Sequence, residues 1–69
     1  MKLSEIKKRY TEIKKDKDQF GRSFYYLMLI VDHQSFMVGK YHADIVSAKW
    51  YQGQLVKALK RLLLAFSKR

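Results

Sequence analysis

Hydrophobic and polar residues follow three different patterns along the chain. In residues 1–19 an apolar side chain recurs at every third or fourth position, and most of the residues between are charged. The recurring apolar residues are Leu3, Ile6, Tyr10 and Ile13. This spacing places them in one narrow seam on the surface of a helix. We therefore predict a basic N-terminal helix over residues 1–19, with the seam as a packing or partner surface.

The second pattern is an unbroken apolar run over residues 24–31, rich in aromatic and β-branched side chains. Its length and composition favour a strand buried on both faces over a helix. The polar residues 32–35 can form a turn, after which residues 35–41 form a second strand. The sequence thus predicts a hairpin over residues 22–41. The alternative is a middle helix over residues 22–36, which would make the fold an all-α three-helix domain.

The third pattern covers residues 44–67. At the 3.6-residue period of a helix, the apolar side chains fall on one broad arc and the basic side chains on the opposite arc. The apolar arc comprises Ala48, Tyr51, Leu55, Ala58, Leu59, Leu62, Ala65 and Phe66. Asp44 is placed to cap the first turn. We predict a basic amphipathic helix over residues 44–67 that packs through the apolar arc.

These elements give a small α+β domain spanning residues 1–69, in the order helix, β-hairpin, helix (α-β-β-α). The apolar run presents hydrophobic side chains on both faces of its strand, and an isolated hairpin is marginally stable in water. Two helices, one with only a narrow seam, cover these faces poorly. We therefore expect a second copy or a larger protein to complete the sheet. The predicted partner interface comprises Leu3, Ile6, Tyr10, Ile13, Tyr25, Leu27 and Leu29.

Composition narrows the class of partner. The 69 residues include 15 Lys or Arg and 6 Asp or Glu, for a net charge of +9, and 48% of them are hydrophobic. The hydrophobic content is too high for a disordered basic tail, and an ordered basic domain is typical of proteins that bind polyanions. The chain has no apolar signal region, and its apolar run is far shorter than the roughly 20 residues that span a bilayer. We expect a cytoplasmic protein without a membrane partner.

The positive charge is unevenly placed. Residues 43–69 carry six basic residues and one acidic residue, whereas residues 2–19 carry seven basic and four acidic residues. Basic side chains along one helix face can bind successive phosphates, and an indole can stack on an exposed base. The predicted nucleic-acid-binding residues are Lys49, Trp50, Lys57, Lys60, Arg61 and Lys68. A secondary basic patch comprises Lys7, Lys8, Lys14 and Lys15.

Catalytic and metal-binding patterns are weak in this chain. There is no cysteine, which excludes disulfides, thiolate metal sites and thiol nucleophiles. His33 and His42 each lie near an aspartate, but they are nine residues apart and lack the spacing of a helical ligand pair. No nucleotide-binding glycine pattern or zinc-protease motif is present. We expect no enzymatic activity, no metal and no cofactor.

The sequence favours a small basic protein that binds DNA or RNA with little sequence specificity, mainly through its C-terminal helix. Compact basic proteins of this kind are common as accessory proteins of phages and other mobile elements. The alternative is a small subunit or inhibitor that docks onto a larger nucleic-acid-processing enzyme through its apolar hairpin. A subunit of that kind could also lend its basic helix to the nucleic-acid channel of its partner.

Overall fold

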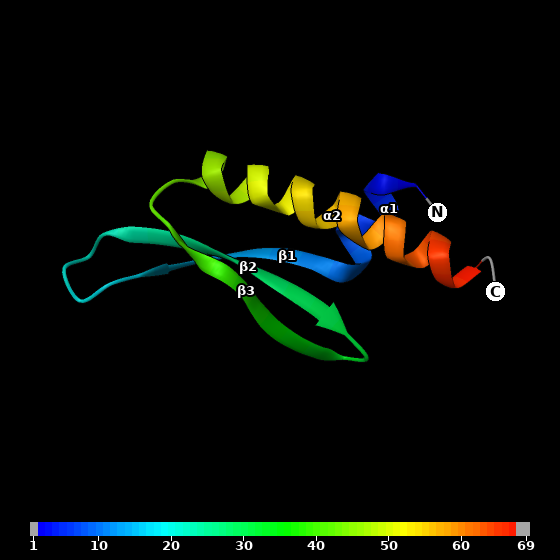
Figure 1. Ribbon diagram of the computed structural model, residues 1–69. Coiled ribbons are helices and arrows are strands. Elements are labelled where there is room, and N and C mark those ends of the chain that lie inside the picture. The colour runs from blue at the N-terminus through cyan, green and yellow to red at the C-terminus, as the bar shows by residue number, and fades with distance from the viewer. Residues whose placement is uncertain (1, 68–69) are drawn as a thin grey trace.

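Two helices and three strands make up the fold in the computed structural model, which describes residues 2–67 (Figure 1). In chain order they are α1 (Leu3–Tyr10), β1 (Thr11–Lys17), β2 (Ser23–Val31), β3 (Gln34–His42) and α2 (Ile45–Ser67). The strands form one antiparallel sheet in the order β1-β2-β3. The α+β class is as predicted, with one strand more than the sequence pattern indicated.

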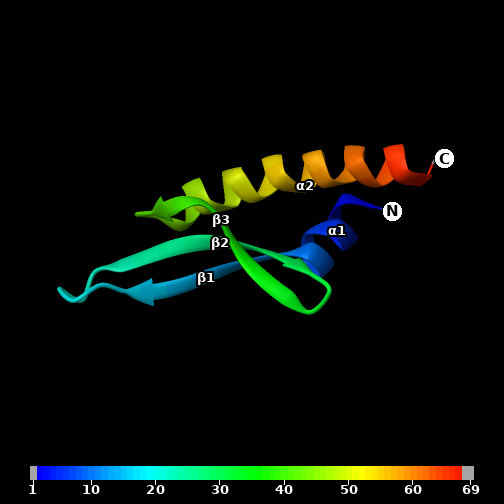
Figure 2. The ribbon, with the colours of Figure 1, turned by 60° about the horizontal axis from the view of Figure 1, so that its bottom comes forward.

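Both helices lie on the same face of the sheet. Figures 1 and 2 show α2 running along this face with α1 beside its C-terminal half. The helix α2 contacts all three strands and also packs against α1. Among residues 2–67, no helix or strand covers the opposite face. The result is a two-layer arrangement in which the sheet has a covered face and an open face.

The predicted N-terminal helix is wrong beyond Tyr10. At Thr11 the backbone becomes extended, and both its N–H and its hydroxyl donate hydrogen bonds to the carbonyl of Lys7. Residues 11–17 then form β1, which pairs with β2 so that Ile13 lies opposite Leu27. The β-branched residues Thr11 and Ile13 suit a strand, and pairing satisfies the backbone of β2 on that side. The gain from strand pairing outweighs the helical spacing of the seam.

The hairpin is confirmed, and its turn is tighter than predicted. Only Asp32 and His33 connect β2 to β3, with φ angles of 49° and 66°. Positive φ at both central residues defines the type I′ turn, whose twist matches that of the flanking strands. Because residues 23–31 form a strand, the all-α alternative with a middle helix over residues 22–36 is wrong.

A bulge interrupts the pairing of β2 with β3. Leu27 lies opposite Val38 and Tyr25 lies opposite His42, so β3 spans four residues where β2 spans two. Within the bulge Gly39 has a φ of 78°, a conformation that glycine adopts without steric cost. Because the bulge adds two residues to β3, the alternation of its side chains is kept, and His42 lies on the covered face of the sheet.

The helix α2 begins as predicted but packs through a different face. The carboxylate of Asp44 accepts a hydrogen bond from the N–H of Ser47 at 2.8 Å, which caps the helix. The buried side chains are Ala48, Gln52 and Val56, whereas Leu62 is 55% exposed. The buried face is thus rotated toward α1, because α2 packs against α1 as well as against the sheet.

A small core lies between the helices and the covered face of the sheet. Its buried apolar residues are Ile6, Leu27, Ala48 and Val56. Beside them the side-chain amide of Gln52 donates a hydrogen bond of 2.9 Å to the hydroxyl of Thr11. Since the Thr11 hydroxyl itself donates to Lys7, this buried chain of hydrogen bonds joins α2, β1 and α1.

Candidate nucleic-acid interface

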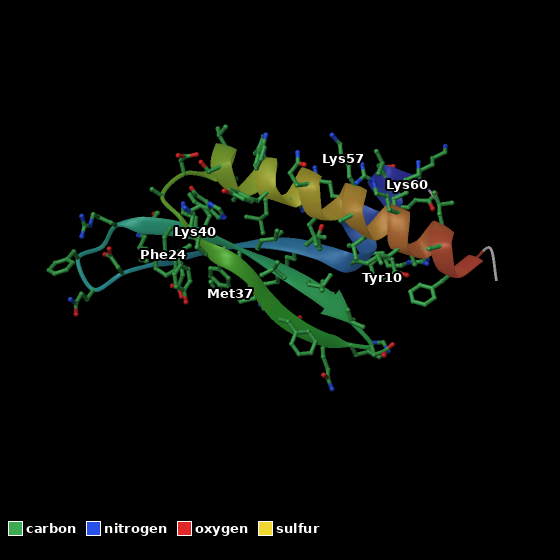
Figure 3. The ribbon with its side chains drawn as sticks, viewed as in Figure 1. Tyr10, Phe24, Met37, Lys40, Lys57 and Lys60 are labelled. Atoms are coloured by element: carbon green, nitrogen blue, oxygen red, sulfur yellow. The ribbon has the colours of Figure 1, made fainter. Side chains whose placement is uncertain are left out.

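The basic residues of α2 lie away from the sheet. Lys49, Lys57 and Arg61 are exposed and Lys60 is half-buried. Figure 3 shows Lys57 and Lys60 on the side of α2 opposite the sheet. The predicted contact Lys68 lies outside the described residues. These four residues of α2, together with Lys7 of α1, are called the basic helix surface below.

A shallow hollow of about 200 Å³ lies on the surface between the two helices. Lys7 of α1 and Lys49 and Lys57 of α2 line it, so three lysines from two helices border one depression. The hollow also borders Gly53, where a Cβ atom would meet no other atom within 4 Å. Sequence reasoning assigned Lys7 to a separate patch, because the contact between α1 and α2 is not visible in the pattern of residues.

Acidic side chains do little to neutralise the basic helix surface. Within residues 2–67 the ion pair is that of Arg22 Nε with Asp18 Oδ2 at 3.3 Å, in the turn between β1 and β2. The exposed Glu5 of α1 lies beside Lys8 and Arg9, and Asp44 is engaged in capping. The positive charge of the helices is therefore available to a bound anion.

One stripe of α2 combines aromatic and basic side chains. Trp50, Lys57 and Arg61 are separated by seven and four residues, which places them on one side of a helix. Trp50 is 59% exposed, and its ring meets that of Tyr51 edge-on at 4.9 Å between centroids. More than half of the Trp50 side chain is therefore accessible to a planar ligand.

The secondary basic patch does not form one surface. Lys7 and Lys8 lie on α1, whereas Lys14 and Lys15 lie on β1, where successive side chains point to opposite faces. Lys15 lies 5.9 Å from the ring centroid of Tyr25, and Lys14 pairs across the sheet with Tyr26. The prediction of a single patch assumed a continuous helix and is corrected by the presence of β1.

The predicted partner interface falls mainly on the covered face of the sheet. Ile6 is fully buried and Leu27 is 2% exposed, so neither reaches the molecular surface of the chain. By alternation along β2, Tyr25 and Leu29 lie on the same face as Leu27. The half-buried Tyr10 and Ile13 lie at the border of the core, and Leu3, at 41% exposure, borders the hollow.

The other side of β2 faces away from the helices, and its four side chains there are half-buried. Alternation along the strands, together with the bulge, places six residues there, which we call the open sheet face: Phe24, Tyr26, Met28, Ile30, Met37 and Tyr41. Figure 3 shows Phe24 and Met37 on the side away from the helices. Tyr41 is 60% exposed, and its ring packs edge-on against the rings of Phe24 and Tyr26.

A second groove, of about 470 Å³, lies between α2 and β3. Its lining includes His42, whose buried ring lies 4.9 Å from that of Tyr51. His33 lies at the opposite end of β3, in the turn, so the two histidines do not converge. In the described part of the chain, no group of three His, Asp or Glu residues could hold a metal ion.

Membrane insertion and known relatives give no further guide to function. Across residues 2–67, neither helix has the length and hydrophobicity needed to cross a membrane. The function must be inferred from the geometry of the chain itself, because comparisons with family models, curated proteins and solved structures find no match.

Proposed function

We propose that the protein binds nucleic acid through the basic helix surface, with little sequence specificity. The observation that carries this proposal is the hollow between the helices, where Lys7, Lys49 and Lys57 converge without ion pairs among the described residues. Phosphate oxygens accept hydrogen bonds from ammonium groups, and each lysine that binds a phosphate displaces counterions from the nucleic acid. A phosphate would sit over Gly53, where there is room for its oxygens.

The stripe of Trp50, Lys57 and Arg61 extends this contact along α2. A helix of 23 residues is about 34 Å long, enough to follow several successive phosphates. Lys57 and Arg61 would bind phosphates, and the indole of Trp50 would stack on an unpaired base. Phosphate contact and stacking do not distinguish one base sequence from another, which accounts for the low specificity that we propose.

A salt titration tests this function directly. Fluorescence anisotropy would follow labelled single- and double-stranded DNA and RNA at salt concentrations from about 50 to about 200 mM. We expect the logarithm of the affinity to fall linearly with the logarithm of the salt concentration, with a slope of about −0.9 for each phosphate contacted on duplex DNA. Absent binding at the lowest salt concentration, or affinity independent of salt, would contradict the proposal.

Two double variants separate a built site from overall charge. Lys49→Ala with Lys57→Ala removes two charges from the hollow, and Lys15→Ala with Lys17→Ala removes two from β1. We expect the first to weaken binding at least about tenfold for all sequences and to reduce the salt slope by about 2. The second should change affinity by less than about threefold. Equal losses would mean that the net charge alone, and not the hollow, governs binding.

The open sheet face favours a second role as an interaction module. Met37 and Tyr41 are exposed and its other four side chains are half-buried, although both helices of the chain are already packed, and exposed apolar patches mark protein contacts. A protein, either a second copy or a larger cytoplasmic partner, would complete the sheet. If docking onto a partner enzyme is the whole function, the chain will bind none of the four nucleic acids in the titration.

A further inference from the structure

The accessible area of the chain is larger than its mass predicts. It exposes 5642 Å², whereas a globular monomer of 8.3 kDa exposes about 4,600 Å². The excess of about 1,000 Å² is comparable with the area of about 800 Å² that each partner buries in a stable interface. Leu62 and Phe66 in the last turns of α2 are exposed, and so are Met37 and Tyr41 of the open sheet face.

Charge distinguishes the open sheet face from the rest of the molecule. Alternation along β1 brings Glu12, Lys14 and Asp16 to this face, opposite the aromatic and methionine side chains of β2. The charges of these three side chains sum to −1, although the chain as a whole carries a net charge of +9. Two copies that meet through their helices would bring lysines together, whereas two copies that meet through their sheets would not.

The same face is poorly suited to nucleic acid. The ring of Tyr41 meets those of Phe24 and Tyr26 at 76° and 83°, so Tyr41 contacts both rings edge-on. A platform for bases needs accessible flat ring faces and nearby cations. On this face of β1, the carboxylates of Glu12 and Asp16 flank the ammonium group of Lys14, which lies opposite Tyr26. The face therefore fits a protein surface of similar apolar character better than a phosphate backbone.

We propose that two copies of the chain pack sheet against sheet through the open sheet face, related by a two-fold axis. Such an interface is self-complementary, and Lys14 of each copy can lie opposite an acidic side chain of the other. The sheets form the inner layers and the helices the outer layers. The two basic helix surfaces then lie on opposite outer sides. If the proposed function holds, this dimer binds two nucleic-acid segments at once and bridges them.

The oligomeric state tests the dimer without reference to nucleic acid. Sedimentation of the full chain at tens of micromolar should give the mass of two chains. Met37→Glu, on the open sheet face, should halve that mass, whereas Leu62→Glu places the same charge on exposed α2 and should leave it unchanged. Tyr41→Lys tests the face with the opposite charge and replaces Met37→Glu if circular dichroism shows that variant to be unfolded. A wild-type monomer, an assembly larger than two chains, or dimeric face variants would overturn the proposal.

Bridging is measured with two duplexes, one carrying a donor dye and the other an acceptor. The wild-type protein should produce energy transfer between them, and Met37→Glu should abolish it while its affinity for a single duplex changes by less than about threefold. Lys49→Ala with Lys57→Ala should reduce both signals. A dimer that binds none of the four nucleic acids of the salt titration would overturn the proposed function and leave the dimer standing. A dimer that binds one duplex without energy transfer would overturn the bridging.

Discussion

The two sides of β2 have similar hydrophobicity and very different surroundings. On one side Leu27 is 2% exposed beneath the helices, and on the other Met28 is half-buried and Met37 of the neighbouring strand is 41% exposed. Both helices are attached next to the sheet, at Thr11 and Asp44, and they pack against each other on one face. The hydrophobicity of a strand residue in a chain this short thus does not decide its burial. The placement of the two helices does.

The largest effect that separates these sides should come from removing one side chain on each. Leu27→Ala leaves a cavity in the core and should lower the free energy of unfolding by about 2–5 kcal/mol. Met28→Ala should lower it by less than about 1 kcal/mol in the monomeric Met37→Glu background, since Met28 packs against no helix there. Urea denaturation followed by circular dichroism measures both.

The wild-type background sharpens this comparison. If a second copy covers the open sheet face, Met28→Ala will cost more there than in the Met37→Glu background, and its cost will depend on protein concentration. Similar costs for Leu27→Ala and Met28→Ala in the monomeric background would mean that the two sides of β2 are equally buried, contrary to the fold described above.

A smaller effect should come from the hydrogen bond that holds α2 to the covered face. Gln52→Ala leaves the Thr11 hydroxyl without its buried donor and removes packing, which should cost about 1–3 kcal/mol. The double variant Thr11→Val with Gln52→Leu replaces both polar groups and should be less destabilising than Gln52→Ala. Thermal unfolding ranks these variants. If the double variant is destabilised by as much as Thr11→Val and Gln52→Leu together, the two residues are not coupled.

The smallest effect should be a gain at the turn that sets the register of β2 with β3. Asp32 and His33 both have positive φ, which Asn-Gly adopts more readily. Asp32→Asn with His33→Gly should raise the free energy of unfolding by about 0.5–1 kcal/mol. Replacing the same two residues by alanine (Asp32→Ala with His33→Ala) should lower the free energy of unfolding, because alanine disfavours this conformation. Urea midpoints of the two variants should move in opposite directions.

The hairpin and the last helix could be predicted from the sequence because their signals are local. The apolar run of β2 and the cap at Asp44 specify those elements without knowledge of distant residues. Strand β1 could not be predicted in this way, because its residues also satisfy helical spacing and only the pairing of Ile13 with Leu27 decides between the two. Tertiary contact overrides local preference there.

The candidate site was predicted in part. Charge asymmetry identified Lys49 and Lys57 as candidates, whereas their convergence with Lys7 depends on a contact between the two helices. The packing face of α2 was misjudged for a related reason. Gln52 is polar and lies outside the predicted apolar arc, but its partner Thr11 lies 41 residues away in the sequence. Periodicity alone cannot reveal a buried polar residue that is satisfied at such a distance.

The charged strand β1 has a consequence for aggregation. An exposed edge strand offers free backbone groups to other chains, and lysines on it discourage strand addition. Three of the seven residues of β1 are lysines, and its last four residues are exposed. A chain with this much accessible apolar surface would otherwise risk indefinite edge-to-edge growth. In the proposed dimer, the lysines of β1 would discourage growth along this edge and leave the open sheet face as the contact between two copies.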